Sequence, residues 1–128
     1  MDAALATTAE ELRRRATRLR LLDLKMVHSA GMGHLGGEMS AMDILTTLYF
    51  GGVLRYDAEH PDDPDRDRFV LSKGHAAAAL YVTLASAGYF HIDELGTWLQ
   101  PNSRLNGHPD RNKLPGIETN TGPLGHGF

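Results

Sequence analysis

Apolar and polar positions alternate with the period of an α-helix over the first part of the chain. One face carries apolar side chains at helical spacing, at Leu12, Ala16, Leu19, Leu22 and Met26. Thr7 with Glu10, and Thr8 with Glu11, both match a capping box, the reciprocal side-chain pairing that closes a helix N-terminus. The pattern therefore predicts a helix from about Thr8 to His28.

A second helical pattern follows a loop from Gly31 to Gly37, in which four of the seven residues are glycine. Its apolar stripe consists of Met42, Leu45, Leu48 and Tyr49. The hydroxyl of Ser40 is suited to cap this helix, and Gly51 with Gly52 is suited to end it. We therefore expect the helix to begin near Ser40.

The stretch from Arg68 to Ser72 predicts a buried β-strand, and Val53 to Tyr56 predicts a shorter one. Lys73 and Gly74 then indicate a tight turn into a helix from about His75 to Ala87, which is apolar on nearly every side. A strand, a glycine turn and a helix with a polar first residue place ligand-binding groups at the carboxyl end of a parallel strand.

These elements, with a further short helix from Asp93 to Leu99, predict an α/β fold that is rich in helix. The expected architecture is a parallel sheet flanked by helices, with residues 1–128 forming part of a single domain. One firm strand cannot satisfy its own backbone groups or cover both of its apolar faces. We therefore expect the chain to be incomplete on its own, with the strand around Phe69 to Leu71 leaning on or paired with another chain.

Composition narrows the class of protein. At 128 residues, with 41% apolar and 23% charged residues, the chain has the make-up of one globular domain. A net charge of -3 provides no basic field for nucleic acid. The N-terminus lacks the layout of a signal peptide, and no apolar run reaches membrane-spanning length. We expect a cytoplasmic protein that binds neither nucleic acid nor membrane.

Two charged clusters have simple structural interpretations. The arginines between Arg13 and Arg20 could grip phosphate or RNA, but neighbouring acids offset them, which favours a solvated helix face. The segment from Asp57 to Asp67 carries six acids and two prolines. Its acids lack the spacing and the glycine of an EF-hand, so it indicates an exposed loop rather than a calcium site.

The candidate chemistry lies in histidines that directly follow a glycine, namely His34, His75, His108 and His126. A neutral imidazole can hydrogen-bond a hydroxyl or carbonyl group and can exchange a proton near neutral pH. Structural alternatives exist, because His34 could cap a helix and the glycine-rich stretch from Gly116 to Phe128 could be a flexible tail.

Four motifs carry a resemblance to a known family. They are Gly33-His-Leu-Gly-Gly37, Asp65-Arg-Asp-Arg-Phe-Val-Leu-Ser-Lys-Gly-His75, Gly107-His-Pro109 and Gly116-Ile-Glu-Thr-Asn-Thr-Gly-Pro-Leu-Gly125. In this order and at this spacing they resemble the start of transketolase, and most of all the amino-terminal subunit of the split, two-chain transketolases. Deoxyxylulose-phosphate synthase, a related enzyme, is similar to fewer of these residues.

The resemblance implies that the chain begins the domain that binds the diphosphate end of thiamine diphosphate. In that family the deprotonated thiazolium carbon of the cofactor attacks a ketose, and a two-carbon ketol unit passes to an aldose. By position, the resemblance implies that His34 and His108 face the reacting end of the sugar. It implies that His75 lies between a substrate hydroxyl and the cofactor diphosphate.

The same resemblance implies that Gly122, Pro123 and Leu124 form a backbone wall against the cofactor. His126 stands where many relatives have glutamine, and only a polar contact is expected of it. The Mg²⁺ or Ca²⁺ ion on the diphosphate is expected to find its ligands, a Gly-Asp-Gly segment and an asparagine, outside this chain. No metal site is expected among its own residues, because the histidines lack the local spacing of ligands.

The resemblance further implies partner chains: the rest of the diphosphate-binding domain and a pyrimidine-binding subunit, in an oligomer that acts on sugar phosphates. One hypothesis is a transketolase part that is active only with these partners. Two alternatives stay open, a non-catalytic transketolase-like interaction or regulatory protein and a deoxyxylulose-phosphate-synthase-like fragment. The sequence does not specify which ketose and aldose are used.

Overall fold

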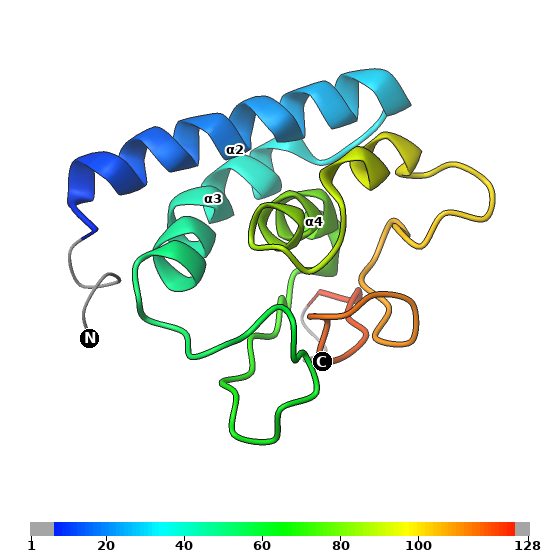
Figure 1. Ribbon diagram of the computed structural model, residues 1–128. Helices are drawn as coiled ribbons and strands as arrows, with labels where there is room; N and C mark the ends of the chain where they lie inside the picture. The colour runs from blue at the N-terminus through cyan, green and yellow to red at the C-terminus, as the bar shows by residue number, and fades with distance from the viewer. Residues whose placement is uncertain (1–6, 125–128) are drawn as a thin grey trace.

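A computed structural model describes residues 7–124 of the chain. Its regular elements are α2 (Ala9–Ala30), α3 (Leu35–Phe50), the 3₁₀ turn η1 (Gly74–Ala76), α4 (Ala77–Ser86) and the 3₁₀ segment η2 (Ile92–Thr97). In Figure 1, α2 lies across the top of the molecule and α4 lies at its centre. The helices α2, α3 and α4 all pack on one another, and η2 packs on α4.

The first helix begins where its capping box predicts. The Glu11 main-chain N–H donates to the Thr8 hydroxyl over 3.1 Å, and the Thr8 N–H donates to the Glu11 carboxylate over 2.7 Å. The helix ends at Gly31, whose φ of 74° lies in the left-handed region that glycine adopts without steric cost. The predicted helix over Thr8 to His28 is confirmed.

The second helix begins earlier than the sequence predicts. Its first residue is Leu35 and its N-cap is His34, so the prediction of a start near Ser40 is wrong. The first turn contains Gly36 and Gly37, which are poor helix formers, but one local and one long-range hydrogen bond hold it. The Glu38 carboxylate accepts the His34 main-chain N–H, and the Lys73 ammonium group donates to the Gly37 carbonyl over 2.8 Å.

The helix α4 forms the centre of the core. Every residue from Ala77 to Ala85 is buried, which agrees with its apolar sequence. Its first turn, formed by small residues from Ala76 to Ala79, lets the neighbouring helices approach closely. The helix predicted over His75 to Ala87 is confirmed, apart from a 3₁₀ first turn at Gly74–Ala76.

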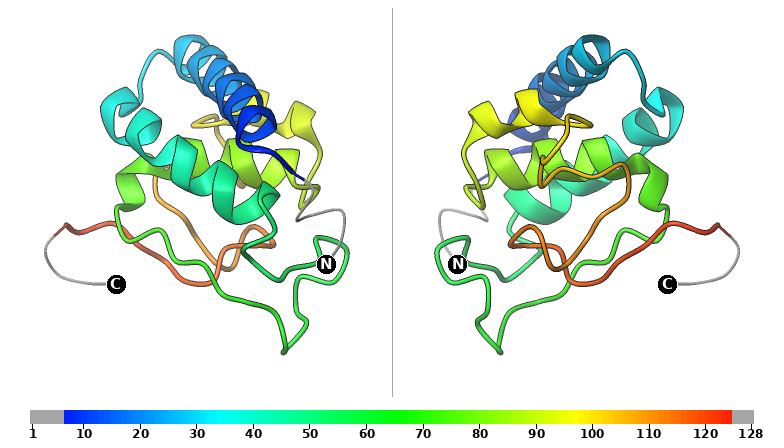
Figure 2. Two further views of the ribbon diagram at one scale, coloured as in Figure 1. Left: turned by 90° about the vertical axis from the view of Figure 1, so that its left-hand side faces the viewer. Right: turned by 90° about the vertical axis from the view of Figure 1, so that its right-hand side faces the viewer.

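The remaining chain forms an irregular layer on one side of the helices. Figure 2 shows the segment between α3 and η1, and the segment that follows η2, running beneath the helices. Neither Val53 to Tyr56 nor Arg68 to Ser72 forms a strand, and no strand occurs within residues 7–124. The predicted parallel sheet is therefore not shown by this part of the chain, because an extended segment becomes a strand only when a neighbour pairs with its backbone.

The last predicted element is also corrected. The stretch expected as a helix from Asp93 to Leu99 is the 3₁₀ segment Ile92–Thr97. Its N-cap is His91, whose ring nitrogen accepts the main-chain N–H of Asp93 over 3.1 Å. Trp98, which directly follows this segment, is buried.

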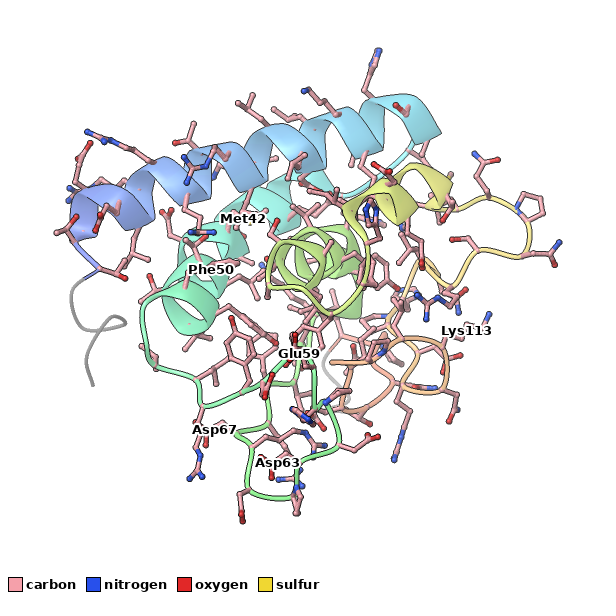
Figure 3. The ribbon with its side chains drawn as sticks, in the orientation of Figure 1. Met42, Phe50, Glu59, Asp63, Asp67 and Lys113 are labelled. Atoms are coloured by element: carbon pink, nitrogen blue, oxygen red, sulfur yellow. The ribbon has the colours of Figure 1, made fainter. Side chains whose placement is uncertain are left out.

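Side chains fasten the irregular layer to itself and to the helices. Arg66 donates two hydrogen bonds, of 2.9 and 2.7 Å, to the carboxylate of Glu118, which joins the acidic loop to a distant segment. The acidic residues of this loop point mainly into solvent, as predicted, and Figure 3 shows Asp63 and Asp67 below the helices. None of the helices in the described part of the chain combines the length and apolarity needed to cross a bilayer.

The packing of α3 can be tested at Met42, which has no exposed surface and is labelled in Figure 3. We expect Met42→Ala to lower the free energy of unfolding by about 2–5 kcal/mol, because the cavity that it leaves cannot fully collapse. Ile44→Ala, on the outer face of the same helix at 61% exposure, should change it by less than about 0.5 kcal/mol. Urea titration of the full chain measures both, and equal losses would contradict this packing.

Candidate functional site

Two of the predicted histidines meet at the first turns of two helices. His34 is the N-cap of α3, and His75 lies in η1 just before α4. Their rings are edge to face, with centroids 5.2 Å apart and planes inclined by 73°. Gly37 makes room for this contact, since a Cβ atom there would lie 2.8 Å from Nε2 of His75.

The third histidine is held in place from the core. The buried ring of Tyr81, in α4, carries a hydroxyl that donates to the Asn106 carbonyl over 2.6 Å and also lies 3.3 Å from the His108 carbonyl. The His108 ring then packs on Gly122, where a Cβ atom would lie 3.6 Å from Cδ2 of the imidazole. The buried phenol of Tyr81 thus helps to hold the segment that carries His108.

A close approach of two backbones joins these two parts of the site. A Cβ atom on Gly74 would lie 2.5 Å from the Thr121 carbonyl oxygen, so only glycine fits beside this chain segment. Gly74 precedes His75, and Thr121 precedes Gly122. The turn that carries His75 therefore rests on the segment against which His108 packs.

The site is open, and its backbone is available to a ligand. His34, His108, Pro123 and Leu124 are exposed, and His75 is half-buried. The hydroxyl of Thr121 is buried without a hydrogen-bond partner, which leaves a free polar group beside Gly122. His126 lies outside the described residues.

These features fit one end of a bound thiamine diphosphate. Imidazole groups and uncovered main-chain atoms can hydrogen-bond both phosphate oxygens and sugar hydroxyls. No cluster of three metal-ligating side chains occurs in the part of the chain that the structure describes. The location of the metal ligands outside this chain stays a prediction.

Sequence reasoning missed Lys73 as part of the site. Its ammonium group bonds the Gly37 carbonyl over 2.8 Å and the Ser40 hydroxyl over 2.9 Å. It therefore ties the turn that carries His75 to the first turn of α3. Its position directly before the Gly-His pair was the available signal.

A buried pair of acids behind His34 was also missed. Asp23, from α2, and Glu38, from α3, have no exposed surface. Burial, a hydrogen bond with Glu38 and the negative charge of Glu38 raise the pKa of Asp23 to about 8. The available signal was the helical spacing, because Asp23 falls in the buried row that contains Leu19 and Met26.

A cavity of about 310 Å³ lies elsewhere, between α2 and η2, lined by residues that include Leu22, Met26 and Trp98. None of the three histidines lines this cavity, so the cavity is separate from the histidine site. The site is instead an open surface, which is expected where a further layer of protein or a ligand completes it.

Comparison with known proteins agrees with this geometry. Residues 12–128 match the family described as "Transketolase, thiamine diphosphate binding domain". The 6-deoxy-6-sulfo-D-fructose transketolase subunit SqwG of Clostridium sp. (strain MSTE9) is 42% identical over 118 residues, which are 92% of this chain and 42% of that protein. An apulose-4-phosphate transketolase subunit of Phocaeicola vulgatus is 44% identical over 118 residues, 92% of this chain and 41% of that protein.

Solved transketolase structures also resemble this chain. Transketolase from Leishmania mexicana superposes with a TM-score of 0.85 at 39% sequence identity, covering 91% of this chain and 17% of that chain. These findings place the chain among thiamine diphosphate binding domains. Within that class it belongs to the transketolase family.

The family assignment confirms the resemblance deduced from the four motifs, including its similarity to transketolase subunits. The predicted α/β class is confirmed only in part. The chain resembles solved transketolase structures and is rich in helix, as expected. The chain spans about two fifths of the length of the two curated subunits that it matches. The roles of the individual histidines stay predictions.

The space at Gly37 gives a sharp test of the site geometry. Gly37→Ala places a methyl group 2.8 Å from Nε2 of His75 and should push that ring out of its contact with His34. Gly36→Ala is the matched control, because its Cβ atom meets nothing within 4 Å. We expect the imidazole NMR signals of His34 and His75 to shift in the first variant alone. Similar shifts in both variants would be evidence against the contact.

The buried acids predict an unusual dependence of stability on pH. With the pKa of Asp23 raised from 3.8 to about 8, the folded chain keeps a proton that the unfolded chain has lost. Stability from this pair is therefore greatest below about pH 4 and falls as pH rises toward 8, by up to about 1.4 kcal/mol per pH unit. Asp23→Asn should remove this slope, as measured by urea unfolding between pH 5 and pH 9. A variant that loses stability in parallel with the parent would show that Asp23 ionises normally.

Proposed function

We propose that this chain is part of a thiamine-diphosphate-dependent transketolase that transfers a two-carbon ketol unit from a ketose to an aldose. The observation that carries the proposal is a chain of contacts: His34 lies against His75, and the turn that carries His75 rests on the Thr121–Gly122 segment against which His108 packs. Membership in the transketolase thiamine diphosphate binding domain family supports it.

The chemistry divides between the cofactor and the protein. When bound, thiamine diphosphate supplies the nucleophilic carbon and the electron sink for breaking and forming a carbon–carbon bond. The protein binds and orients the sugar and moves protons at its oxygen atoms. Neutral imidazoles suit this work, because they donate at one nitrogen and accept at the other near neutral pH.

The geometry suggests a division of roles among the histidines. His75, half-buried between α3 and the segment at Thr121, is suited to bond both a substrate hydroxyl and the cofactor diphosphate. His34 and His108 are exposed at the mouth of the site and are suited to the reacting end of the sugar. The main chain at Gly122, Pro123 and Leu124 would form the wall beside the cofactor, with the Thr121 hydroxyl as a further donor.

The enzyme is proposed to need partner chains. Two relatives are named as transketolase subunits, and the histidine site is open on the side away from the helices. Such partners would supply the rest of the diphosphate-binding domain, the ligands for Mg²⁺ or Ca²⁺ and the pyrimidine-binding part. An oligomer in the cytoplasm that acts on sugar phosphates completes this proposal.

The proposal is tested by assaying ketol transfer with the full chain, its partner subunits, thiamine diphosphate and Mg²⁺. The ketose donors to try first come from the names of the relatives, 6-deoxy-6-sulfo-D-fructose and apulose 4-phosphate. Transfer of a two-carbon unit to an aldose supports the proposal. A complex that binds the cofactor but transfers no ketol unit from any ketose would favour a regulatory protein.

Single substitutions in the assembled enzyme separate the roles of the histidines. His75→Ala should weaken cofactor binding and lower turnover by about 100-fold or more, because one imidazole serves both groups. His108→Ala should lower turnover with the ketose but leave the affinity for thiamine diphosphate nearly unchanged.

His60→Ala is the matched control, since His60 lies on the exposed acidic loop, where its ring pairs with Asp57 over 2.8 Å. It should change neither quantity. Calorimetric titration measures cofactor affinity and a coupled assay measures turnover. Equal losses of cofactor affinity in the His75 and His108 variants would refute this assignment.

A further inference from the structure

The buried acids Asp23 and Glu38 lie directly behind the N-terminus of α3. Asp23 comes from α2, Glu38 comes from the first turns of α3, and both side chains have no exposed surface. One oxygen of Glu38, Oε2, accepts the main-chain N–H of His34. A buried carboxyl group thus holds the residue that caps the helix and faces the site.

The other oxygens of the pair have no donor if both groups are ionised. Oε1 of Glu38 and both carboxyl oxygens of Asp23 are buried, and no N–H or O–H group of the described chain donates to them. Glu38 is the group whose hydrogen bond and charge raise the pKa of Asp23, so the two carboxyl groups are neighbours. Two carboxylates cannot bond each other, whereas one carboxyl group and one carboxylate can, through an O–H···O bond.

No nearby cation replaces that proton. None of the ion pairs within residues 7–124 includes Asp23 or Glu38. Arg20 and Lys73 reach this region, but they bond the carbonyl groups of Met39 and Gly37, on either side of Glu38.

The other elements that pack here do not neutralise the pair either. The helix α4 carries no charged side chain, and its Tyr81 hydroxyl is turned to the Asn106 carbonyl. In η2, Glu94 is bonded to Arg104, while Asp93 is largely exposed. On α2 itself, Lys25 and His28 are exposed. On the site side the ring of His34 faces His75.

We propose that Asp23 and Glu38 share one proton and that this shared proton positions His34, by fixing the Glu38 carboxyl group on the His34 main-chain N–H. Both acids are positioning residues, because neither touches the site surface. With the proton present, Asp23 and Glu38 bond each other and the N-cap of α3 is held. When the proton leaves, two buried negative charges repel, Glu38 moves, and the His34 N–H loses its acceptor.

The consequence for function rests on the proposed catalytic role of His34. Loss of the proton at alkaline pH would loosen His34 from its edge-to-face contact with His75. The assembled enzyme would then lose turnover on the alkaline side of its pH profile. The proton on the buried pair would therefore set the upper pH limit of activity without taking part in the reaction.

The test is a pH titration of the full chain, in the assembly in which it is isolated, labelled with ¹³C and ¹⁵N. The carboxyl carbon of Asp23 and the amide of His34 are followed between pH 5 and pH 10. We expect both signals to move with one shared midpoint near pH 8. An Asp23 carboxyl signal that titrates only below pH 5, with a His34 amide that does not respond, would overturn the proposal.

Isosteric variants identify the source of the transition. Asp23→Asn should abolish the alkaline transition of the His34 amide, because the pair no longer has an ionisable proton. Glu38→Gln should also abolish it while keeping an oxygen acceptor for the His34 N–H, so the amide should stay near its low-pH position. Asp43→Asn, at an exposed site on the same helix that pairs with Arg20, is the control and should keep the transition. An unchanged transition in Asp23→Asn would rule out the shared proton.

Activity provides a second, separable readout. In the assembled enzyme, the alkaline fall in turnover should share the midpoint of the His34 amide and disappear in Asp23→Asn. If the amide titrates as expected but turnover is level across the midpoint, the shared proton stands and the catalytic role proposed for His34 fails.

Discussion

The close packing around α4 is the constraint on which the rest of the structure depends. Residues Ala76 to Ala79 have no exposed surface, and their small side chains let α2 and α3 approach the helix from outside. Two parts of this packed helix position the histidines of the site. The turn before the helix carries His75, and the Tyr81 hydroxyl in its second turn holds the segment of His108. A helix without charged side chains thus positions two candidate histidines of the site.

The sequence was a reliable guide where a structure is determined by neighbours in the chain. The capping box at Thr8 and Glu11 and the apolar run of α4 are local signals, and both elements were predicted correctly. Strand formation at Arg68 to Ser72 is different, because the hydrogen-bond partner of a strand lies elsewhere. Its central residues, Phe69 to Leu71, are apolar, but no neighbour pairs with them in the described part of the chain. Strand propensity marked the segment and could not supply its partner.

The candidate site, like the fold, could be predicted from the sequence only in part. The glycine–histidine pairs indicated the residues, but not that Gly37 would face His75 or that Gly74 would rest on Thr121. Such contacts depend on the packing of whole helices. The start of α3 was misplaced because its first turn contains glycines, which are poor helix formers. The Glu38 carboxylate that accepts the His34 N–H is only four residues along the chain, whereas the bond from Lys73 to Gly37 comes from a distant segment. Two signals within reach of sequence reasoning were overlooked: Asp23 in a row of buried apolar positions, and Lys73 directly before a Gly-His pair.

The buried acids also bear on how stability and function are balanced in this chain. Apolar side chains of similar size at Asp23 and Glu38 would avoid the desolvation of two carboxyl groups, and such replacements often leave a protein equally or more stable. Packing alone therefore gives no reason for acids at these two positions. An apolar residue at Glu38 would, however, leave the N–H of His34 without its acceptor at the edge of the site. Glu38 is buried where it reaches that N–H, and a second acid that retains a proton keeps the pair from carrying two negative charges. The position of His34 then follows from the chemistry of a pair that the ligand never touches.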